Sequence, residues 1–362
     1  MMRWTFLAPS VARPAGGVIA LFEIVNALAR GGDLVQVVHL PTPQGTVGGL
    51  GDVPWMSFDP SVQHHFAAAF DPATLPEAEA VVYTTMVLAA ALGPEGGPAG
   101  RSLVASLRGP TTGRVSVLFL QGHGVFPPEV ERLAAELPGL KVCVGSWLVD
   151  LLVSEGAPAA DVVHIPNGLD PQTFHVVQPI EHRPAHTAMN FDPYPVKGGE
   201  VGLEALVRVQ RLHEVDGTVF GTRPPERALP SGLRFVASPR QAEIATTIYN
   251  QASVYLQPSR REGFGMCAVE AMACGCALVT TANGGSAEYA FHDETALVCG
   301  PSAEEMAEAI GRLVGDDALR LRLATAGAHF VQRFRWTTTA ERLRQAVAER
   351  LAGDQGSSGT DG

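Results

Sequence analysis

Two glutamates flank a glycine-containing turn in residues 261–276, which read REGFGMCAVEAMACGC. Glu262 and Glu270 are separated by seven residues, and Gly263 and Gly265 lie between them. Glycine adopts backbone angles that are closed to other residues, so a ligand can approach the main chain closely at such a turn. The two carboxylates beside it are suited to accepting hydrogen bonds from a polyhydroxylated ligand.

A helix is expected to begin directly after this turn. Residues 252–259 (ASVYLQPS) have the composition of a short buried strand that is ended by a proline, and residues 267–272 have helix-forming composition. The amides near Gly265 and Met266 then form a helix N-terminus, where a negatively charged group is stabilised. We therefore expect the ligand to carry phosphate as well as hydroxyl groups, with the first glutamate on the loop and the second inside the helix.

The same glycines allow a second interpretation. Gly263, Gly265 and Ala268 form G-x-G-x-x-A between a strand and a helix, which is the fingerprint of a dinucleotide-binding site. Such a site needs an acidic residue about 20 positions further on, at the end of the next strand, to hold the ribose hydroxyls. The next expected strand, 277–281, is followed by no carboxylate before Glu288. An NAD-dependent oxidoreductase is therefore a minor alternative.

The composition is that of a folded α/β protein. With 362 residues, of which 46% are hydrophobic, the chain is long enough for two domains with separate cores. The formal net charge of −11 argues against nucleic acid or an anionic membrane as the main partner, because both bind basic surfaces. Peripheral contact with a membrane is left open, and any phosphate must be bound by local donors.

The five cysteines form no paired C-x2-C spacing, so we expect neither a zinc site nor a disulfide framework. No Asp-x-Asp motif occurs either, which favours a site that uses lysine, arginine and backbone amides and needs no metal. Residues 1–17 lack the long apolar run of a signal peptide, and no window approaches a transmembrane span. We therefore expect a cytoplasmic protein.

Short apolar segments recur along the chain in two series, with helical stretches between several of them. The expected strands of the first series are 4–8, 34–39, 81–84, 115–120, 141–144 and 162–165. Those of the second series are 187–190, 217–220, 233–236, 254–256, 277–281 and 295–298. Each series is typical of a doubly wound parallel sheet, so the sequence predicts an α/β fold with two Rossmann-like domains.

Between the two series, the proline-bearing segment 176–184 (VVQPIEHRP) is the expected linker. Two Gly/Pro-rich segments, 42–60 and 93–113, are expected to be long loops. We expect an N-terminal domain, a second domain, a C-terminal helix and a polar, disordered tail. These parts are placed at 1–178, 179–335, 336–352 and 353–362.

Three phrases of the second domain together resemble a known family. They are Pro-Ser-x-x-Glu-Gly-Phe-Gly at 258–265, Glu-Ala-Met-Ala-x-Gly at 270–275 and Gly-Gly-x-x-Glu at 284–288. The combination resembles retaining nucleotide-sugar glycosyltransferases of the GT-B fold, in particular glycosyltransferase family four. The resemblance implies two Rossmann-like domains facing a ligand cleft, and a final helix that crosses back to the first domain.

The activity implied is transfer of a hexosyl or deoxyhexosyl group, with retention, from a nucleoside-diphosphate sugar to an acceptor hydroxyl. The acceptor would belong to a glycan, a polysaccharide precursor or a small natural product. The sugar nucleotide is a co-substrate, and no other cofactor is expected. Among the branches of the family, the phrases FLQGHGVFP, VGSWLVDLL and HIPNGLD look most like the rhamnosyltransferase-type branch.

The resemblance also implies roles for particular residues. Glu262 would bind the donor-sugar hydroxyls and Glu270 the ribose hydroxyls of the nucleotide, while Lys197, in PYPVKGG, would bind the diphosphate. The family usually has an arginine a few residues before this lysine, where this sequence has Asn190 and Phe191. The remaining residues assigned to the donor and nucleotide are Asn190, Arg261, Gly263, Phe264, Gly265 and Met266, and Arg260 or Arg223 are further candidates to replace the arginine.

In the first domain, Gly16 and Gly17 open the expected first helix. By resemblance their loop lies over the diphosphate and near the acceptor; the alternative is a plain strand-to-helix turn. His123 follows a strand and so lies at the carboxyl edge of the sheet, where open α/β sheets bind ligands. In the family a histidine from this region helps to hold the donor sugar, whereas a lone histidine is more often structural.

The stereochemical expectation depends on the early glycine loop. Inverting GT-B enzymes commonly carry a general-base histidine there, close to the acceptor hydroxyl. The first histidine of this chain is His39, beyond the expected first helix, which agrees with retention. Two other classes stay open, namely a GT-B epimerase or phosphorylase and a non-catalytic sugar-nucleotide-binding protein.

Overall fold

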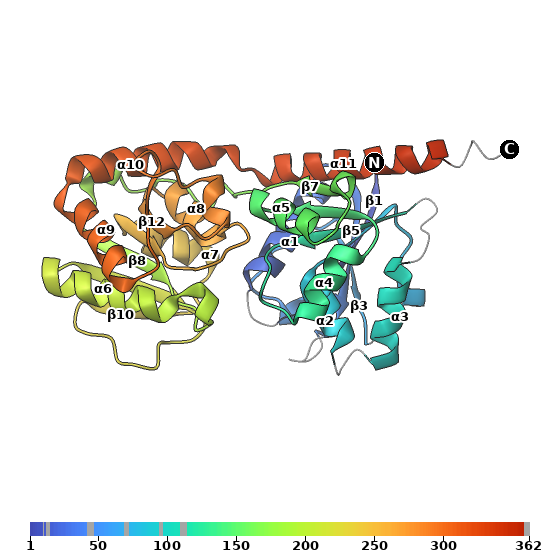
Figure 1. The fold of residues 1–362 in the computed structure, drawn as a ribbon, viewed down its shortest axis with the longest axis horizontal. Coiled ribbons are helices and arrows are strands. Elements are labelled where there is room, and N and C mark those ends of the chain that lie inside the picture. Colours follow the sequence, from blue (N-terminus) through green and yellow to red (C-terminus); the bar gives the residue numbers. More distant parts are fainter. Residues whose placement is uncertain are drawn as a thin grey trace. The chain divides into compact units, whose positions relative to one another are not determined.

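The protein divides into two compact units in the computed structural model (Figure 1). The structure describes residues 1–9, 11, 15–41, 47–68, 72–93, 97–108 and 114–357. The first unit contains residues 1–168 and 336–362, and the second unit contains residues 169–335. Each unit is built on one parallel sheet, and Figure 1 shows helices on both faces of each sheet.

The sheet of the first unit has seven strands in the order β3-β2-β1-β4-β5-β6-β7. The strands are β1 (Arg3–Pro9), β2 (Leu34–Leu40), β3 (Gln63–Phe66), β4 (Ala80–Tyr83), β5 (Val115–Leu120), β6 (Leu140–Cys143) and β7 (Val162–His164). The helices of this unit are α1 (Gly16–Arg30), α2 (Thr85–Leu92), α3 (Gly97–Arg108), α4 (Pro128–Glu136), α5 (Ser146–Ser154) and α11 (Trp336–Ser357).

The sheet of the second unit has six strands in the order β10-β9-β8-β11-β12-β13. The strands are β8 (His186–Asn190), β9 (Asp216–Gly221), β10 (Leu233–Ala237), β11 (Val254–Gln257), β12 (Ala277–Thr281) and β13 (Ala296–Cys299). The helices are α6 (Gly199–His213), α7 (Gln241–Glu243) with a π-helical continuation (Ile244–Tyr249), α8 (Met266–Ala273), α9 (Ala303–Gly315) and α10 (Asp317–Phe330).

The central strands of both sheets are buried along their whole length. Every residue of β5 (VSVLFL) and of β12 (ALVTT) is buried, because helices cover both faces of a parallel sheet. In both sheets the strand order reverses beside the first strand, between β1 and β4 and between β8 and β11. Ligands of open α/β sheets bind outside the carboxyl ends of the strands at such a reversal. The expected two doubly wound sheets are therefore confirmed, and each contains one such position.

Helix α11 belongs to the first unit, although it follows the second unit in the sequence. Arg344 forms an ion pair of 2.8 Å with the buried Asp33, and Thr339 donates a hydrogen bond of 2.8 Å to the carbonyl of Pro166. These contacts join the helix to the first unit. Of the tail expected at 353–362, residues 358–362 lie outside the described part of the chain, and α11 continues to Ser357.

The chain passes between the units after Gly168, earlier than the boundary expected after residue 178. Residues 169–183 are bonded to the second unit. The amides of Val177 and Gln178 donate to the side-chain oxygen of Asn250, at 2.8 and 3.2 Å. Arg183, 3% exposed, donates to the carbonyls of Gln178 and Cys274. The segment expected to be an extended linker is therefore part of the second unit, because its backbone and buried guanidinium find their partners there.

Two local predictions differ from the structure. Residues 97–108 form helix α3 within the segment that was expected to be a loop, because Leu103, Val104 and Leu107 recur at helical spacing and are buried. Edge strand β3 (QHHF) was not predicted, because its polar composition gives no apolar alternation. Within the part of the chain that the structure describes, none of the helices is long and apolar enough to span a membrane.

Candidate active site

Lys197 and Glu262 meet where the strand order of the second sheet reverses. Lys197 lies in a short helical turn, Pro195–Lys197, after β8, and Glu262 lies in the loop after β11. These two strands are neighbours and parallel, so the loops after them leave the same edge of the sheet. The sequence separates the two residues widely, and the topology brings them together.

Glycines fix the lysine loop against the end of β11. Gly198 has a φ of 65°, and a Cβ there would collide with the backbone carbonyl of Pro258. A Cβ on Gly199 would collide with the carbonyl of Asp192. A side chain at position 198 would push the loop away from Pro258, and one at position 199 would push it away from Asp192, so packing requires both glycines.

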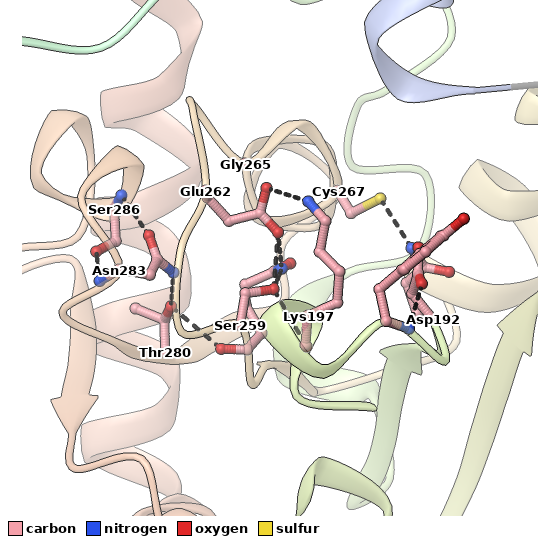
Figure 2. Close-up of polar contacts among 12 residues, drawn as sticks. Asp192, Lys197, Ser259, Glu262, Gly265, Cys267, Thr280, Asn283 and Ser286 are labelled. Carbon is pink, nitrogen blue, oxygen red and sulfur yellow. Dashed lines mark hydrogen bonds and ion pairs between the residues drawn. The ribbon is translucent and has the colours of Figure 1, made fainter. Parts of the chain in front are cut away.

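The ammonium group of Lys197 lies 2.8 Å from Oε2 of Glu262 (Figure 2). The lysine side chain is 33% exposed and that of Glu262 only 11%. Burial alone would lower the pKa of Lys197, but the attraction and hydrogen bond of Glu262, with a smaller contribution from Asp192, outweigh it and raise this pKa. The lysine is therefore charged at neutral pH and faces carboxylates.

The other carboxylate oxygen of Glu262 is held by two buried side chains. Oε1 accepts a hydrogen bond of 2.7 Å from the hydroxyl of Ser259 and one of 3.0 Å from the amide nitrogen of Gln257. Tyr255 donates from behind to the amide oxygen of Gln257 at 3.4 Å. No role was predicted for Gln257 or Ser259, although two polar residues at the end of an apolar strand indicate one.

The backbone of Glu262 is also fixed. Its N–H donates to the carbonyl of Asn283 at 2.9 Å, and its carbonyl accepts from the N–H of Gly285 at 3.0 Å. Asn283 is in turn held by the loop that follows β12, because its side-chain oxygen accepts from the N–H of Ser286 and its amide donates to Thr280. Figure 2 shows the contacts of Asn283 with Ser286 and Thr280. Together with the backbone bonds of Glu262, they connect the loops that follow β11 and β12.

Gly265 precedes helix α8 and has a φ of 97°. A Cβ on it would collide with the hydroxyl of the buried Tyr289, which donates to the carbonyl of Gly265 at 3.4 Å. The ring of Phe264 packs edge-on against Tyr289 and Phe334, and the side chain is 2% exposed. The structure thus places Phe264 in the core and uses the space beside Gly265 for a tyrosine, while Met266, the first residue of α8, is partly exposed.

Glu270 lies inside α8, as expected, and is 8% exposed. Cys267 lies three residues earlier on the same helix. Burial first, and then the charges of Glu270 and Glu262, raise the pKa of this thiol to about 12. Asn190, at the end of β8, donates to the sulfur of Cys267 at 3.7 Å. Cys267, for which no role was predicted, is therefore a neutral thiol at neutral pH and has Asn190 as a partner of its sulfur.

Arg260 and Arg261 lie beside this group and are exposed. With Pro195 and Val196 they line a surface hollow of about 310 Å³ next to the lysine turn. The N–H of Arg260 donates to the carbonyl of Val196 at 2.8 Å, which ties the two loops together. Arg223, the third candidate for the missing arginine, is also exposed in the loop after β9.

In the first unit, Gly16 is the first residue of α1, and a Cβ on Gly17 would collide with the side chain of Gln121. Gln121 follows β5, so the glycine turn and the loop that carries His123 lie side by side at the carboxyl edge of this sheet. Nε2 of His123 lies 3.5 Å from Glu131 and 3.2 Å from Glu155.

Glu131 holds the His123 loop by its backbone. Its Oε1 accepts hydrogen bonds of 3.0, 3.2 and 3.0 Å from the N–H groups of Gly124, Val125 and Phe126. The side chain is 6% exposed, so this carboxylate acts as a buried cap for three successive amides. Glu131 was not among the predicted residues, because its partners are backbone groups, which no sequence pattern specifies.

The predicted site residues are therefore divided between the two units. The second unit contains Asn190, Lys197, Arg261, Glu262, Gly263, Phe264, Gly265, Met266 and Glu270, and the first unit contains Gly16, Gly17 and His123. Among the described residues, no group of three or more His, Cys, Asp or Glu side chains is arranged to hold a metal ion.

The fold is of the GT-B type, as comparison with solved structures shows. Sucrose-phosphate synthase from Thermosynechococcus elongatus superposes with a TM-score of 0.74 at 19% identity, over 98% of this chain and all of that one. HepE from Anabaena, solved in complex with UDP and glucose, has a TM-score of 0.72 at 17% identity, over 96% of this chain and all of that one. At such low identity these likenesses establish the fold alone.

Sequence comparison finds similar proteins that are named as glycosyltransferases. A family model described as "Glycosyl transferases group 1" matches residues 235–330, which include both glutamates. D-inositol 3-phosphate glycosyltransferase of Streptomyces bingchenggensis is 32% identical over 161 residues, or 44% of this chain. Phosphatidyl-myo-inositol mannosyltransferase of Mycobacterium tuberculosis is 26% identical over 97% of this chain and 98% of its own length. The chain spans only 33% of the length of the Streptomyces relative.

Proposed function

We propose that this protein is a glycosyltransferase that moves a sugar from a nucleoside-diphosphate sugar to an acceptor hydroxyl, with retention and without a metal ion. The observation that carries the proposal is the Lys197–Glu262 ion pair at the reversal of the second sheet, beside the N-terminus of the helix that contains Glu270. One cation, two carboxylates and helix amides there match the groups of a sugar nucleotide. The family match over residues 235–330 supports the same class.

In this mechanism Lys197 binds the diphosphate, Glu262 the hydroxyls of the donor sugar and Glu270 the ribose. The bond between the anomeric carbon and the phosphate oxygen breaks, and the ammonium group stabilises the charge that develops on that oxygen. The acceptor oxygen bonds to the anomeric carbon from the same face. Its proton passes to the leaving phosphate oxygen, so no protein base is required in the step.

Two carboxylates, Glu262 and Asp192, act on Lys197, and their negative charges would repel a diphosphate bound there. Arg260 and Arg261 supply the compensating charge in our proposal, because they line the hollow next to the lysine turn. Charge-assisted bonds of this kind contribute about 1.5 to 3 kcal/mol each. The donor would carry a hexosyl or deoxyhexosyl group, with a rhamnosyl donor as one candidate. Inositol-type alcohols, the acceptors named for the relatives, are the first acceptors to test.

The test is donor turnover followed by NMR. The purified protein is incubated with UDP-, GDP-, dTDP- and ADP-sugars, with and without EDTA, in the presence of a panel of alcohols that includes inositol phosphates. The proposal predicts release of one nucleoside diphosphate in both conditions and a product with the anomeric configuration of the donor. Inversion would contradict retention, and loss of activity with EDTA would contradict metal independence. Tight nucleotide binding without turnover would favour a non-catalytic binding protein.

A further inference from the structure

Gln257 is a polar side chain in a position that its strand otherwise fills with apolar residues. It ends β11 (VYLQ), all of whose residues are buried, and is 7% exposed. A buried amide is costly unless its hydrogen-bonding groups have partners. In Gln257 these groups have partners. The amide nitrogen donates to Ser259 at 2.8 Å and to Glu262 at 3.0 Å, and the amide oxygen accepts from the hydroxyl of Tyr255. These hydrogen bonds form a chain from the buried Tyr255 through Gln257 to Glu262.

We propose that Gln257 and Ser259 are positioning residues that fix Glu262, and that Lys197 is the exchangeable partner of the same carboxylate. The proposal rests on the proposed function, because it assigns Lys197 to a diphosphate and Glu262 to a sugar. It adds that the carboxylate keeps its place when the lysine bonds to the ligand.

The two oxygens of Glu262 have partners of different kinds. Oε1 is held by Ser259, which is 1% exposed, and by Gln257, both of which belong to β11 or its immediate extension. Oε2 is held by Lys197, whose flexible side chain is 33% exposed. A diphosphate competes for the ammonium group of this partly exposed side chain, whereas the donors on Oε1 are buried. Ligand binding therefore removes the partner of Oε2 alone, and that oxygen then accepts a hydrogen bond from a sugar hydroxyl.

Each side-chain donor of Gln257 and Ser259 has an acceptor. The two N–H groups of Gln257 go to Ser259 and Glu262. The hydroxyl of Ser259 accepts from Gln257 and lies 2.7 Å from Oε1 of Glu262, closer than the 3.3 Å to the carbonyl oxygen of Lys197. The main chain of Glu262 is held on both sides by Asn283 and Gly285. A carboxylate with its backbone and one oxygen fixed loses little freedom on binding, which is the condition for precise orientation of a reacting sugar.

The experiment compares Gln257→Met and Ser259→Ala with a matched control, Ser253→Ala. Ser253 is also buried and lies just before the opposite end of β11, where its hydroxyl accepts from the N–H of His186 at 3.1 Å. Three quantities are measured for each variant: kcat and KM for the sugar nucleotide that the wild type uses, and Kd for the corresponding nucleoside diphosphate by calorimetry. The nucleoside diphosphate lacks the sugar that Glu262 binds, so it reports on the rest of the site.

We expect kcat to fall by about 10- to 30-fold in each of the two variants, since each removes one donor from a charged group. The double variant should fall by much less than the product of the two, because both act on one oxygen. Kd for the nucleoside diphosphate should stay within about twofold of wild type, as should every property of Ser253→Ala. A residue with a merely structural role would instead change Kd and kcat together.

Two results would overturn the proposal. One is a kcat in Gln257→Met and Ser259→Ala equal to that of Ser253→Ala. The other is a crystal structure of Gln257→Met in which the Glu262 carboxylate keeps its position. The crystal structure does not depend on turnover, so it decides the positioning role even if the wild type uses no sugar nucleotide, an outcome that would reject the proposed function instead.

Discussion

The carboxyl edges of the two sheets are organised in different ways. In the second unit, side chains bond to side chains: Lys197 to Glu262, and Glu262 to Ser259 and Gln257. In the first unit, the carboxylate of Glu131 bonds to three backbone amides and holds His123 near its other oxygen. A site made of side-chain pairs needs particular residue types at each of its positions. A carboxylate that caps backbone amides does not depend on the side chains of the loop that it holds.

This difference explains why the sequence predicted more residues of the site in the second unit than of the one in the first unit. We propose that the second unit binds the donor, whose nucleoside diphosphate has a constant chemistry, and that the first unit binds an acceptor of variable chemistry. Variants of the two units should therefore change different quantities.

Loss of Lys197 should have the largest effect. Lys197→Ala removes the cation that stabilises the leaving diphosphate, and loss of one such group in the transition state lowers kcat by about 100- to 1,000-fold. Oε2 of Glu262 also loses its partner. Steady-state kinetics with the sugar nucleotide measures the effect, and Arg208→Ala, which removes an exposed cation paired with Glu204 and Glu304, is the control. A kcat within threefold of wild type would exclude this role for the lysine.

Glu270→Ala should act on binding more than on turnover. If Glu270 holds the ribose hydroxyls, its loss weakens nucleoside-diphosphate binding by about 10- to 100-fold, corresponding to one charged hydrogen bond. The measurement is calorimetric Kd. A variant with unchanged Kd and reduced kcat would place Glu270 at the reacting centre, contrary to our assignment.

The first unit should lose stability as the pH falls. Burial, followed by the charges of His64 and His65, lowers the pKa of His39 to about 4. Between that value and the ordinary histidine pKa of about 6.5, the unfolded chain binds a proton that the folded chain does not, so stability rises with pH and is lost as the pH falls through this range. From pH 7 to pH 5 the loss is about 2 kcal/mol.

Hydrogen exchange at β2 and β3, with β11 and β12 as reference strands, measures this loss. His64, whose ring nitrogen lies 3.0 Å from His39, has a pKa lowered in the same direction. His39→Gln removes the first titrating group, so its exchange in β2 should depend much less on pH. An equal pH dependence in both proteins would show that another group is responsible.

Glu131→Gln should have the smallest effect. The substitution keeps the shape of the side chain but replaces a charged acceptor of three amides by a neutral one, which we expect to lower kcat by about 5- to 10-fold through the His123 loop. Nucleoside-diphosphate affinity, a property of the second unit, should not change. A weaker Kd in this variant would contradict the division of roles between the units.

The sequence predicted most of the framework, because buried parallel strands leave continuous apolar segments such as VSVLFL and ALVTT. It also predicted the placement of Glu262 on a loop and Glu270 in a helix. Edge strand β3 was missed, because polar residues occupy it. The partners of Glu262 were missed for another reason: Gln257 and Ser259 act through hydrogen bonds whose direction only the fold determines.

The role of glycine at two positions also needed the structure. Gly265 was expected to let a ligand approach the main chain. In the structure the hydroxyl of Tyr289 occupies the space that a side chain at this position would need. Gly198 was part of the K-G-G phrase, and its φ of 65° against Pro258 explains why no side chain fits there. A sequence pattern indicates that glycine is required, whereas the neighbouring atoms show what requires it.

Nucleotide binding tests the central claim most directly. Thermal shifts of the wild type and Glu270→Ala are measured with UDP, GDP, dTDP, ADP and NAD, each with and without EDTA. We predict a shift with one nucleoside diphosphate that EDTA does not change and that the variant loses. A shift with NAD alone would contradict the account and would support a dinucleotide site at Gly263 and Gly265.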